Sequence, residues 1–193
     1  MLVSYGKLSN YHLLQKYGFT MVDNQYNSVP FYATFPEENM LISQEKELKF
    51  NLYKKTGIQN YLMAFRLFDN KIDPNFLASF RIAFLSTDMI NKMTFDHVYN
   101  HETFKNPLSK TQEEIILKAI LRNINSFLNE LQRGRSGEQT YAEMRDAIGM
   151  IDSTYKMHMF NVYNLQHDEE RVLAKNKAFI EEKIKDLLNS KAI

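Results

Sequence analysis

Three short motifs open the chain: Val3-Ser4-Tyr5-Gly6, then Ser9-Asn10-Tyr11-His12-Leu13-Leu14, then Tyr17-Gly18-Phe19. The first has the apolar alternation expected at the end of a strand. Ser9 is a good N-cap, which predicts a short helix through Lys16, and Gly18 just beyond is typical of a helix end. Apolar residues alternating from Val29 to Phe35 predict a second strand, ended by Pro36. Residues 1–36 are therefore expected to form a small α/β unit.

The remainder of the chain has the pattern of a helical domain. Ser43 and Gly57 bound one predicted helix, and Asp73-Pro74 is a strong start signal for a second. Ser109 and Gln112 have the spacing of a capping box, in which each side chain accepts a hydrogen bond from the other residue's backbone N–H, at the start of a long third helix. Further helices are predicted over residues 89–95, over residues 141–148 and from residue 152 onward. The run 59–68 fits a buried strand or a connecting segment equally well. The predicted fold class is mainly α, with a small α/β remnant in front.

Composition excludes several classes of function. The 193 residues carry a net charge of +1, which gives no electrostatic signature for nucleic acid or an anionic membrane. With no cysteine, a thiolate zinc site is unavailable. None of the six glycines forms a G-x-G or Walker sequence, so no phosphate-binding loop is predicted. No apolar run of about 18 residues and no export signal are found, so we expect an intracellular protein, cytoplasmic or nuclear, without a membrane partner.

The three opening motifs resemble the closing segment of a SET-domain protein methyltransferase. The resemblance is to the class that includes the Rubisco large-subunit lysine methyltransferase and the actin-histidine methyltransferase. The helical region resembles the substrate-binding domain that follows the SET domain in that class. Its matching features are the helix ending at Gly57, the run from Phe76 to Leu85, the helix from Ser109 and the segment 169–173, where relatives often carry G-E-K-x-x-L. The resemblance implies a SET remnant over residues 1–36 and a helical substrate-binding domain over residues 37–193.

The resemblance also implies roles for three aromatic residues. Tyr5 matches the tyrosine that lines the channel where the substrate nitrogen meets the methyl group of S-adenosylmethionine, so it would be a catalytic residue that positions the nucleophile. Phe19 and Tyr17 match positions beside the cofactor. Without the resemblance, Tyr5 would be a strand tyrosine packed on the following helix. Phe19 would be a core aromatic next to Gly18, and Tyr17 a structural residue.

Most of the expected cofactor site has no counterpart in this sequence. The class binds S-adenosylmethionine with a glycine-containing loop near the start of the SET domain and an N-H-S-type segment some 45 residues before the tyrosine. Only four residues precede Tyr5 here. Loss of most contacts leaves too little binding free energy to offset the entropy of association. We therefore expect this chain alone to bind the cofactor negligibly and to be inactive.

No metal site is predicted. His97 and His101 lie four residues apart beside Asp96 and Glu102, but Val98 stands where the metalloprotease motif H-E-x-x-H requires glutamate. The segment is expected to be a loop with solvent-exposed polar residues. His158 and His167 have no nucleophile at a recognisable spacing.

Two functions fit these observations. The first is part of an S-adenosylmethionine-dependent protein-lysine methyltransferase, with histidine as a less favoured target, in which this portion chiefly docks the protein substrate. The second is a catalytically inactive helical protein-interaction module or a subunit of a larger assembly. In both, the partner is a protein. The aromatic residues between Tyr61 and Phe84 are most simply core, although an apolar groove that holds the partner is the alternative.

Overall fold

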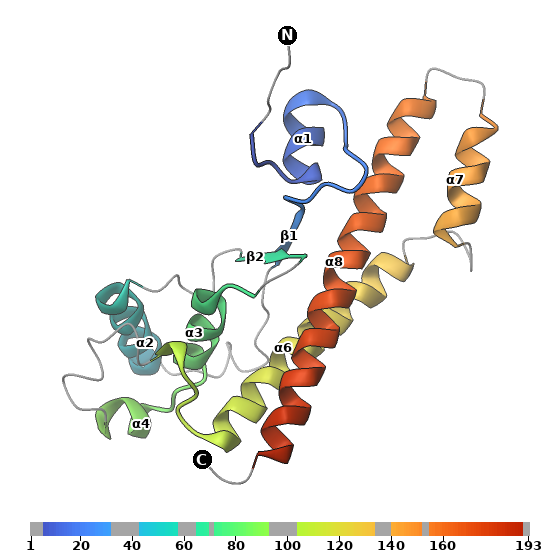
Figure 1. The fold of residues 1–193 in the computed structure, drawn as a ribbon. Helices are drawn as coiled ribbons and strands as arrows, with labels where there is room; N and C mark the ends of the chain where they lie inside the picture. Colours follow the sequence, from blue (N-terminus) through green and yellow to red (C-terminus); the bar gives the residue numbers. More distant parts are fainter. Residues whose placement is uncertain are drawn as a thin grey trace. The chain divides into compact units, whose positions relative to one another are not determined.

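The computed structural model describes residues 6–31, 43–57, 65–69, 72–92, 104–133, 140–151 and 155–190. These residues form seven α-helices and one two-stranded sheet (Figure 1). The predicted fold class, mainly α with a small α/β remnant, is confirmed. No helix of the described residues is long and apolar enough to span a membrane.

The N-terminal helix begins after the predicted N-cap and ends at Tyr17, one residue later than predicted. Helix α1 spans Asn10–Tyr17, with Ser9 in the extended N-cap conformation. Gly18 ends it at φ 78°, and the glycine N–H donates to the Leu14 carbonyl. That left-handed conformation favours glycine because a Cβ would be strained there. Strand β1, Ser28–Phe31, pairs with strand β2, Phe65–Phe68. The run 59–68 thus ends in a strand, and residues 32–42 lie outside the described residues.

The chain divides into two compact units, each made of several segments. Unit 1 comprises Met1–Pro30, Arg66–Lys71 and Ile124–Lys177. Unit 2 comprises Phe31–Phe65, Ile72–Asn123 and Ala178–Ile193. The boundary near residue 36 that the family resemblance implies stays a prediction.

Unit 2 has an aromatic core built on helix α3, Pro74–Ala83, which begins as predicted. Asp73 caps it by accepting a hydrogen bond from the Asn75 N–H. Edge-to-face contacts join Phe76 to Phe31 and to Phe65, with ring centroids 5.7 and 5.1 Å apart. Phe80 lies 4.8 Å from Phe76 and is fully buried. The interpretation of these aromatics as core is confirmed for Phe65, Phe76 and Phe80, whereas Phe68 and Phe84 are only partly buried and Tyr61 lies outside the described residues.

Helix α2, Ser43–Thr56, packs on α3, and its polar side chains satisfy the end of that helix. Lys49 donates to the Ala83 carbonyl at 2.8 Å, and the Tyr53 hydroxyl donates to the Ser79 carbonyl at 2.8 Å. The short helix α4, Thr87–Lys92, follows α3. Within this unit a buried ion pair joins Arg81 to Glu113, with 2.8 Å between Nε and Oε2.

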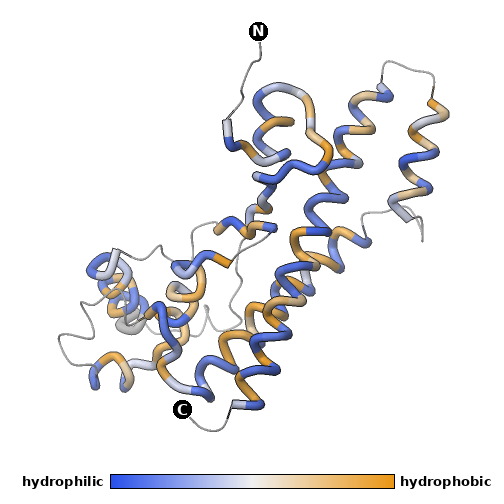
Figure 2. The backbone as a smooth tube through the Cα atoms, viewed as in Figure 1, coloured by the Kyte–Doolittle hydropathy of each residue, from blue (hydrophilic) through white to orange (hydrophobic). Residues whose placement is uncertain are grey.

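Three helices complete the chain: α6, Lys110–Arg133; α7, Tyr141–Gly149; and α8, Lys156–Asn189. Figure 2 shows hydrophobic residues alternating with hydrophilic ones along α6 and α8, as expected for helices with one packed face. The capping box predicted at Ser109 is only half formed. Ser109 Oγ accepts from the Gln112 N–H, but the glutamine side chain turns to the Phe84 carbonyl instead, and its oxygen has no partner. The full capping box lies at the start of α7, between Thr140 and Glu143.

Candidate functional site

The sequence places its candidate site residues around α1. Tyr5, the expected catalytic residue, lies outside the described residues. Tyr17 is at the end of α1 with 52% of its surface exposed, and Phe19 follows with a partly exposed ring. The two ring centroids are 6.3 Å apart at an interplanar angle of 37°. These rings form one apolar surface beside the C-terminus of α1, whereas their roles as cofactor contacts stay predictions.

Asn10, the first residue of α1, is the centre of a buried hydrogen-bond network. Its side-chain amide donates to the Met21 carbonyl at 2.8 Å and to Asp168 Oδ2 at 2.5 Å. Its side-chain oxygen accepts from the Met21 N–H and from the Asn24 amide. Its backbone N–H donates to Asn27 Oδ1 at 3.1 Å, so all the polar groups of this fully buried residue that face the network are satisfied. Because each of these bonds is directional, they fix the orientation of α1 on α8.

The same stretch is tied to α8 a second time, after the helix ends. Asn161 accepts hydrogen bonds from the backbone N–H and the hydroxyl of Thr20, both at 3.0 Å. Its own amide donates to the Gly18 carbonyl. Asn164, one turn further along α8, donates to the Thr20 hydroxyl at 3.2 Å. The segment that carries Tyr17 and Phe19 is thus held at both ends.

A set of charged side chains joins α8 to the end of β2. Arg171 donates to Asp69 at 2.6 Å and to Asp168 at 3.3 Å, and Lys175 also pairs with Asp69 at 3.0 Å. Asn176 donates to the Phe68 carbonyl. Helix α8 therefore presents one polar side to both the N-terminal segment and the sheet.

The start of α1 is fixed to the sheet through Arg66 of β2. The guanidinium donates to the hydroxyls of Ser28 and Ser9, each at 2.9 Å. Ser9 Oγ also lies 3.0 Å from His12 Nδ1. Partial burial lowers the pKa of His12, and the positive charges of Arg66 and Lys16 lower it further. At neutral pH this imidazole is therefore neutral, and it can share a hydrogen bond with the serine hydroxyl.

Burial also shifts the carboxylates on α8. It raises the pKa of Asp168, and the hydrogen bond from Asn10 and the charge of Arg171 offset only part of that rise. Burial and then the neighbouring Asp168 charge raise the pKa of Glu169. Two adjacent carboxylates with raised pKa values are common at functional sites, although structural networks produce the same shifts. Here Asp168 is engaged by Asn10 and Arg171, which assigns it to the support of α1.

The network can position the segment before α1 but offers no chemistry of its own. Among the described residues, no group of three or more histidine, aspartate or glutamate side chains could hold a metal ion. His97 and His101 lie outside the described ranges. The geometry suits a support that orients residues before and after α1.

Sequence reasoning singled out the Ser9-Asn10 pair as part of a motif but did not identify the partners of Asn10. The carboxylate that Asn10 binds lies 158 residues further along the chain. No local pattern links such distant positions, and Asp168 on its own reads as an ordinary polar residue of a helix. The one usable signal was an asparagine at the first turn of a helix, where asparagine is otherwise a cap rather than a buried residue.

Comparison with known proteins gives a consistent result for the fold. No family model and no curated protein sequence matches this chain. Among solved structures, Rubisco LSMT bound to sinefungin and monomethyllysine matches over 98% of this chain, with a TM-score of 0.72 and 17% identity. Rubisco LSMT bound to AdoMet matches over 98% of this chain, with a TM-score of 0.70 and 18% identity. The SET domain of LSMT bound to lysine and AdoHcy matches over 95% of this chain, with a TM-score of 0.69 and 18% identity.

These matches cover only 39–42% of the other chains, so this sequence spans about two-fifths of their length. At this level of identity the likeness shows the fold, not the activity. The resemblance read from the opening motifs is confirmed to that extent: this chain has the fold of part of the Rubisco LSMT methyltransferase structures.

Proposed function

We propose that this chain is part of an S-adenosylmethionine-dependent protein-lysine methyltransferase, and that this part chiefly docks the protein substrate. The observation that carries the proposal is the match of nearly the whole chain, 98%, to structures of Rubisco LSMT. Those structures hold AdoMet, AdoHcy, sinefungin, lysine or monomethyllysine, which are ligands of a methyl transfer to an amine.

In this proposal the Asn10 network supports the reaction indirectly. It holds α1 against α8, and α1 follows the segment with Tyr5 by only a few residues. Tyr5 would position the substrate amine, while S-adenosylmethionine supplies the methyl group when bound. The exposed ring of Tyr17 and the partly exposed ring of Phe19 fit one wall of such a cofactor site because aromatic faces stack well on other rings. Two rings alone do not make a cofactor site.

The cofactor part of the proposal is tested by isothermal titration calorimetry of S-adenosylmethionine into the 193-residue chain. We expect a dissociation constant weaker than about 1 mM, because most contacts of the expected site are absent from this sequence. Micromolar binding would overturn the expectation of negligible binding. A Tyr17→Ala, Phe19→Ala double variant would then report whether these rings contribute.

The docking part is tested by photo-crosslinking in cells that make the protein. A photoreactive residue replaces Met150 or Tyr155, which are 86% and 71% exposed in unit 1, and Phe50, which is 57% exposed in unit 2, is the matched control. We expect the unit 1 positions to capture one protein that carries methylated lysine, and the control to capture none. Capture of a protein without methyl-lysine would favour the inactive interaction module, and no capture would contradict docking.

A further inference from the structure

Tyr155, the residue before helix α8, and three residues of that helix form a row of side chains spaced four residues apart, and the row is only partly covered. These side chains, Tyr155, Met159, Tyr163 and His167, are called the α8 row below. Side chains at this spacing lie on one side of a helix. Tyr155 is 71% exposed and Met159 44% exposed, whereas Tyr163 is only 8% exposed. His167, at the end of the row, is again exposed, so Tyr163 is the one buried member of the row.

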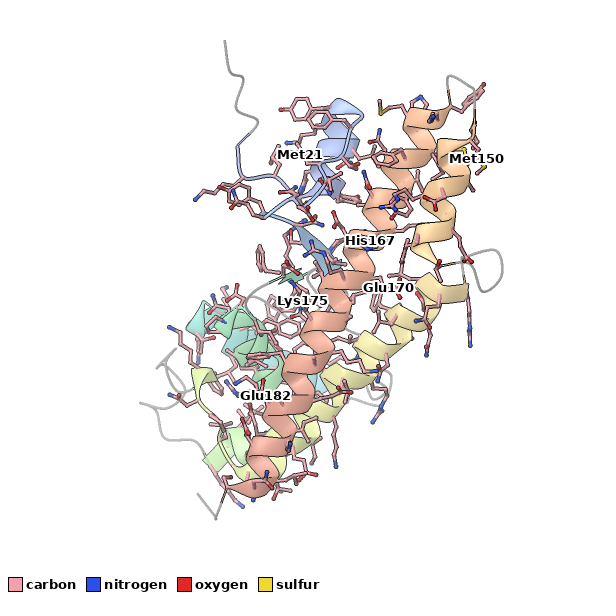
Figure 3. The ribbon with its side chains drawn as sticks, turned by 45° about the vertical axis from the view of Figure 1, so that its right-hand side comes forward. Met21, Met150, His167, Glu170, Lys175 and Glu182 are labelled. Carbon is pink, nitrogen blue, oxygen red and sulfur yellow. The ribbon has the colours of Figure 1, made fainter. Side chains whose placement is uncertain are left out.

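The covering element is α7, which runs antiparallel beside the first half of α8 (Figures 1 and 3). The ring of Tyr141 packs edge-to-face on Tyr163 and on His167, with centroids 5.7 and 4.9 Å away. Two turns later, Ile148 is buried at 5% exposure. Six of the nine residues of α7 are exposed, so the helix packs through a narrow face.

Helix α7 depends on this packing and on its caps. A helix of nine residues is marginal in water without tertiary contacts. At its start, Thr140 and Glu143 form the capping box, and the hydrogen bond from the Thr140 N–H lowers the pKa of Glu143. At its end, Lys156 donates to the Gly149 carbonyl at 2.8 Å. Because so few of its side chains are buried, the local opening of α7 should cost less free energy than the unfolding of the whole chain.

Apolar exposure continues past the part of the row that α7 covers. Met150 at the end of α7 is 86% exposed, and Met157 at the start of α8 is 64% exposed. Methionine side chains adapt to many partner shapes and are common at surfaces that bind amphipathic helices. Both residues belong to unit 1, and Met157 lies on another side of α8 than Met159, because the two are only two positions apart in the helix.

We propose that the α8 row is the docking site for an amphipathic helix of a partner protein, and that α7 is an internal occupant which the partner helix displaces. The chemistry of the partner follows from α7 itself: an aromatic side chain, as at Tyr141, and a branched aliphatic side chain two turns later, as at Ile148. The proposal rests on the proposed function only for the idea that the chain docks proteins. It needs neither cofactor nor methyl transfer.

The first test measures the opening of α7 with introduced cysteines, since the chain has none of its own. Reaction with Ellman's reagent is followed for Ile148→Cys, for Ala142→Cys on the exposed face of α7, and for Ile120→Cys in the core of unit 2. We expect Ile148→Cys to react more slowly than Ala142→Cys but at least about tenfold faster than Ile120→Cys, because only local opening is needed. Equal rates at residues 148 and 120 would overturn the proposal.

The second test measures docking with a fluorescent peptide of residues 140–150, the α7 sequence, and the full chain. In the unaltered chain, α7 competes at a high effective concentration, so peptide binding is weak. Tyr141→Ala removes two aromatic contacts and should strengthen peptide binding at least about tenfold relative to Arg145→Ala, a substitution on the exposed face of α7. A peptide with serine at the positions of Tyr141 and Ile148 should not bind.

Cooperative urea unfolding of both variants shows that they fold. If Tyr141→Ala does not fold, Thr140→Ala replaces it, because that substitution weakens the capping box and leaves the contacts of the Tyr141 ring in place. Equal peptide affinity in Tyr141→Ala (or in Thr140→Ala, if that replaces it) and in Arg145→Ala would overturn the proposal. Since no cofactor or natural substrate is used, this outcome is distinguishable from failure of the proposed function.

Discussion

The two units are stabilised in different ways. Among the described residues, six buried asparagines lie in unit 1, namely Asn10, Asn24, Asn27, Asn161, Asn164 and Asn176, against Asn123 alone in unit 2. Unit 2 instead buries Phe31, Phe65, Phe76, Phe80 and Phe104. The hydrophobic effect is non-directional, whereas hydrogen bonds between amides depend on direction. The unit that holds the candidate site is the one whose interior specifies orientation.

The surfaces differ in the same sense. Exposed large apolar side chains gather in unit 1, where ten of the fourteen in the described residues are found: Tyr11, Tyr17, Met21, Val22, Tyr26, Met150, Tyr155, Met157, Met159 and Val162. Exposed apolar surface marks sites of interaction when it is gathered rather than scattered. Unit 1 therefore combines a hydrogen-bonded interior with most of the exposed large apolar side chains of the described residues.

The largest expected effect on stability is in the aromatic core of unit 2. Phe76→Ala should lower the free energy of unfolding by about 3–5 kcal/mol, because a large cavity forms among rings that cannot collapse fully. Urea unfolding followed by circular dichroism gives the value. Phe50→Ala, at an exposed phenylalanine of the same unit, is the control and should change it by less than about 1 kcal/mol. A loss at Phe76 as small as that of the control would disprove the account of the core.

The second largest effect on stability is expected in the hydrogen-bond network around Asn10 in unit 1. Asn10→Ala should cost about 2–4 kcal/mol, because it leaves Asp168 Oδ2 and the backbone of Met21 without the hydrogen bonds that Asn10 makes to them. Asn51→Ala, at an exposed asparagine within α2, is the matched control and should change stability by about 0.5 kcal/mol or less. Hydrogen exchange at the amides of α1 should also speed up in Asn10→Ala only. Unchanged exchange there would show that the network does not hold the helix.

A smaller effect depends on pH. The pKa of Glu169 is raised in the folded state, so folding favours its protonated form and stability is lost as pH rises from its ordinary value, 4.5, through the raised one. Glu169→Gln removes that loss. The variant should therefore gain stability relative to the unaltered chain at pH 7 and gain less at pH 4.5. Melting temperatures at the two values test this, with Glu130→Gln on the exposed face of α6 as control. A stability gain in Glu169→Gln that is the same at both pH values would contradict a raised pKa of Glu169 in the folded state.

The smallest effect is expected at the surface of unit 2. Lys118→Ala breaks an exposed ion pair with Glu114 one turn away on α6, at 2.6 Å. Such pairs contribute about 0.5 kcal/mol or less, and salt screens them. The loss measured by urea unfolding should disappear at about 1 M salt. A loss that persists in salt would mean that the lysine stem, not its charge, stabilises the helix.

Much of the fold could be predicted from local sequence. Ser9 and Gly18 bound α1, Asp73-Pro74 starts α3, and Gly57 follows α2, because caps and breakers act within one or two turns. Gln112 shows where local reasoning fails. Its spacing from Ser109 fits a capping box, but the Phe84 carbonyl lies within reach of its side chain and takes its place. A contact with a distant segment thus overrode a local preference.

The candidate site was predictable only in part. The opening motifs identified the fold, but the bond between Asn10 and Asp168 joins positions 158 residues apart and has no local signal. The exposure of the apolar side chains at the start of α8 could not be predicted from local sequence either. Tyr155, Met159 and Val162 have helical spacing like the buried Val172 and Ile180, yet the first three are exposed and the last two are fully buried. Periodicity gives the face of a helix that is apolar, whereas neighbouring elements decide how much of it is covered.

By itself, the sequence determined where most helices lie, the caps of α1 and α3, and the resemblance carried by Ser9-Asn10, Tyr17-Gly18-Phe19 and the helical run behind them. These features depend on propensity, capping and short motifs, which act between near neighbours. Only the tertiary structure decided that α1 is held to α8 by buried amides, and that Tyr141 of α7 packs on Tyr163 and His167 of the α8 row. Hydrogen bonds and burial join whichever groups the folded chain brings together, and sequence separation does not limit them.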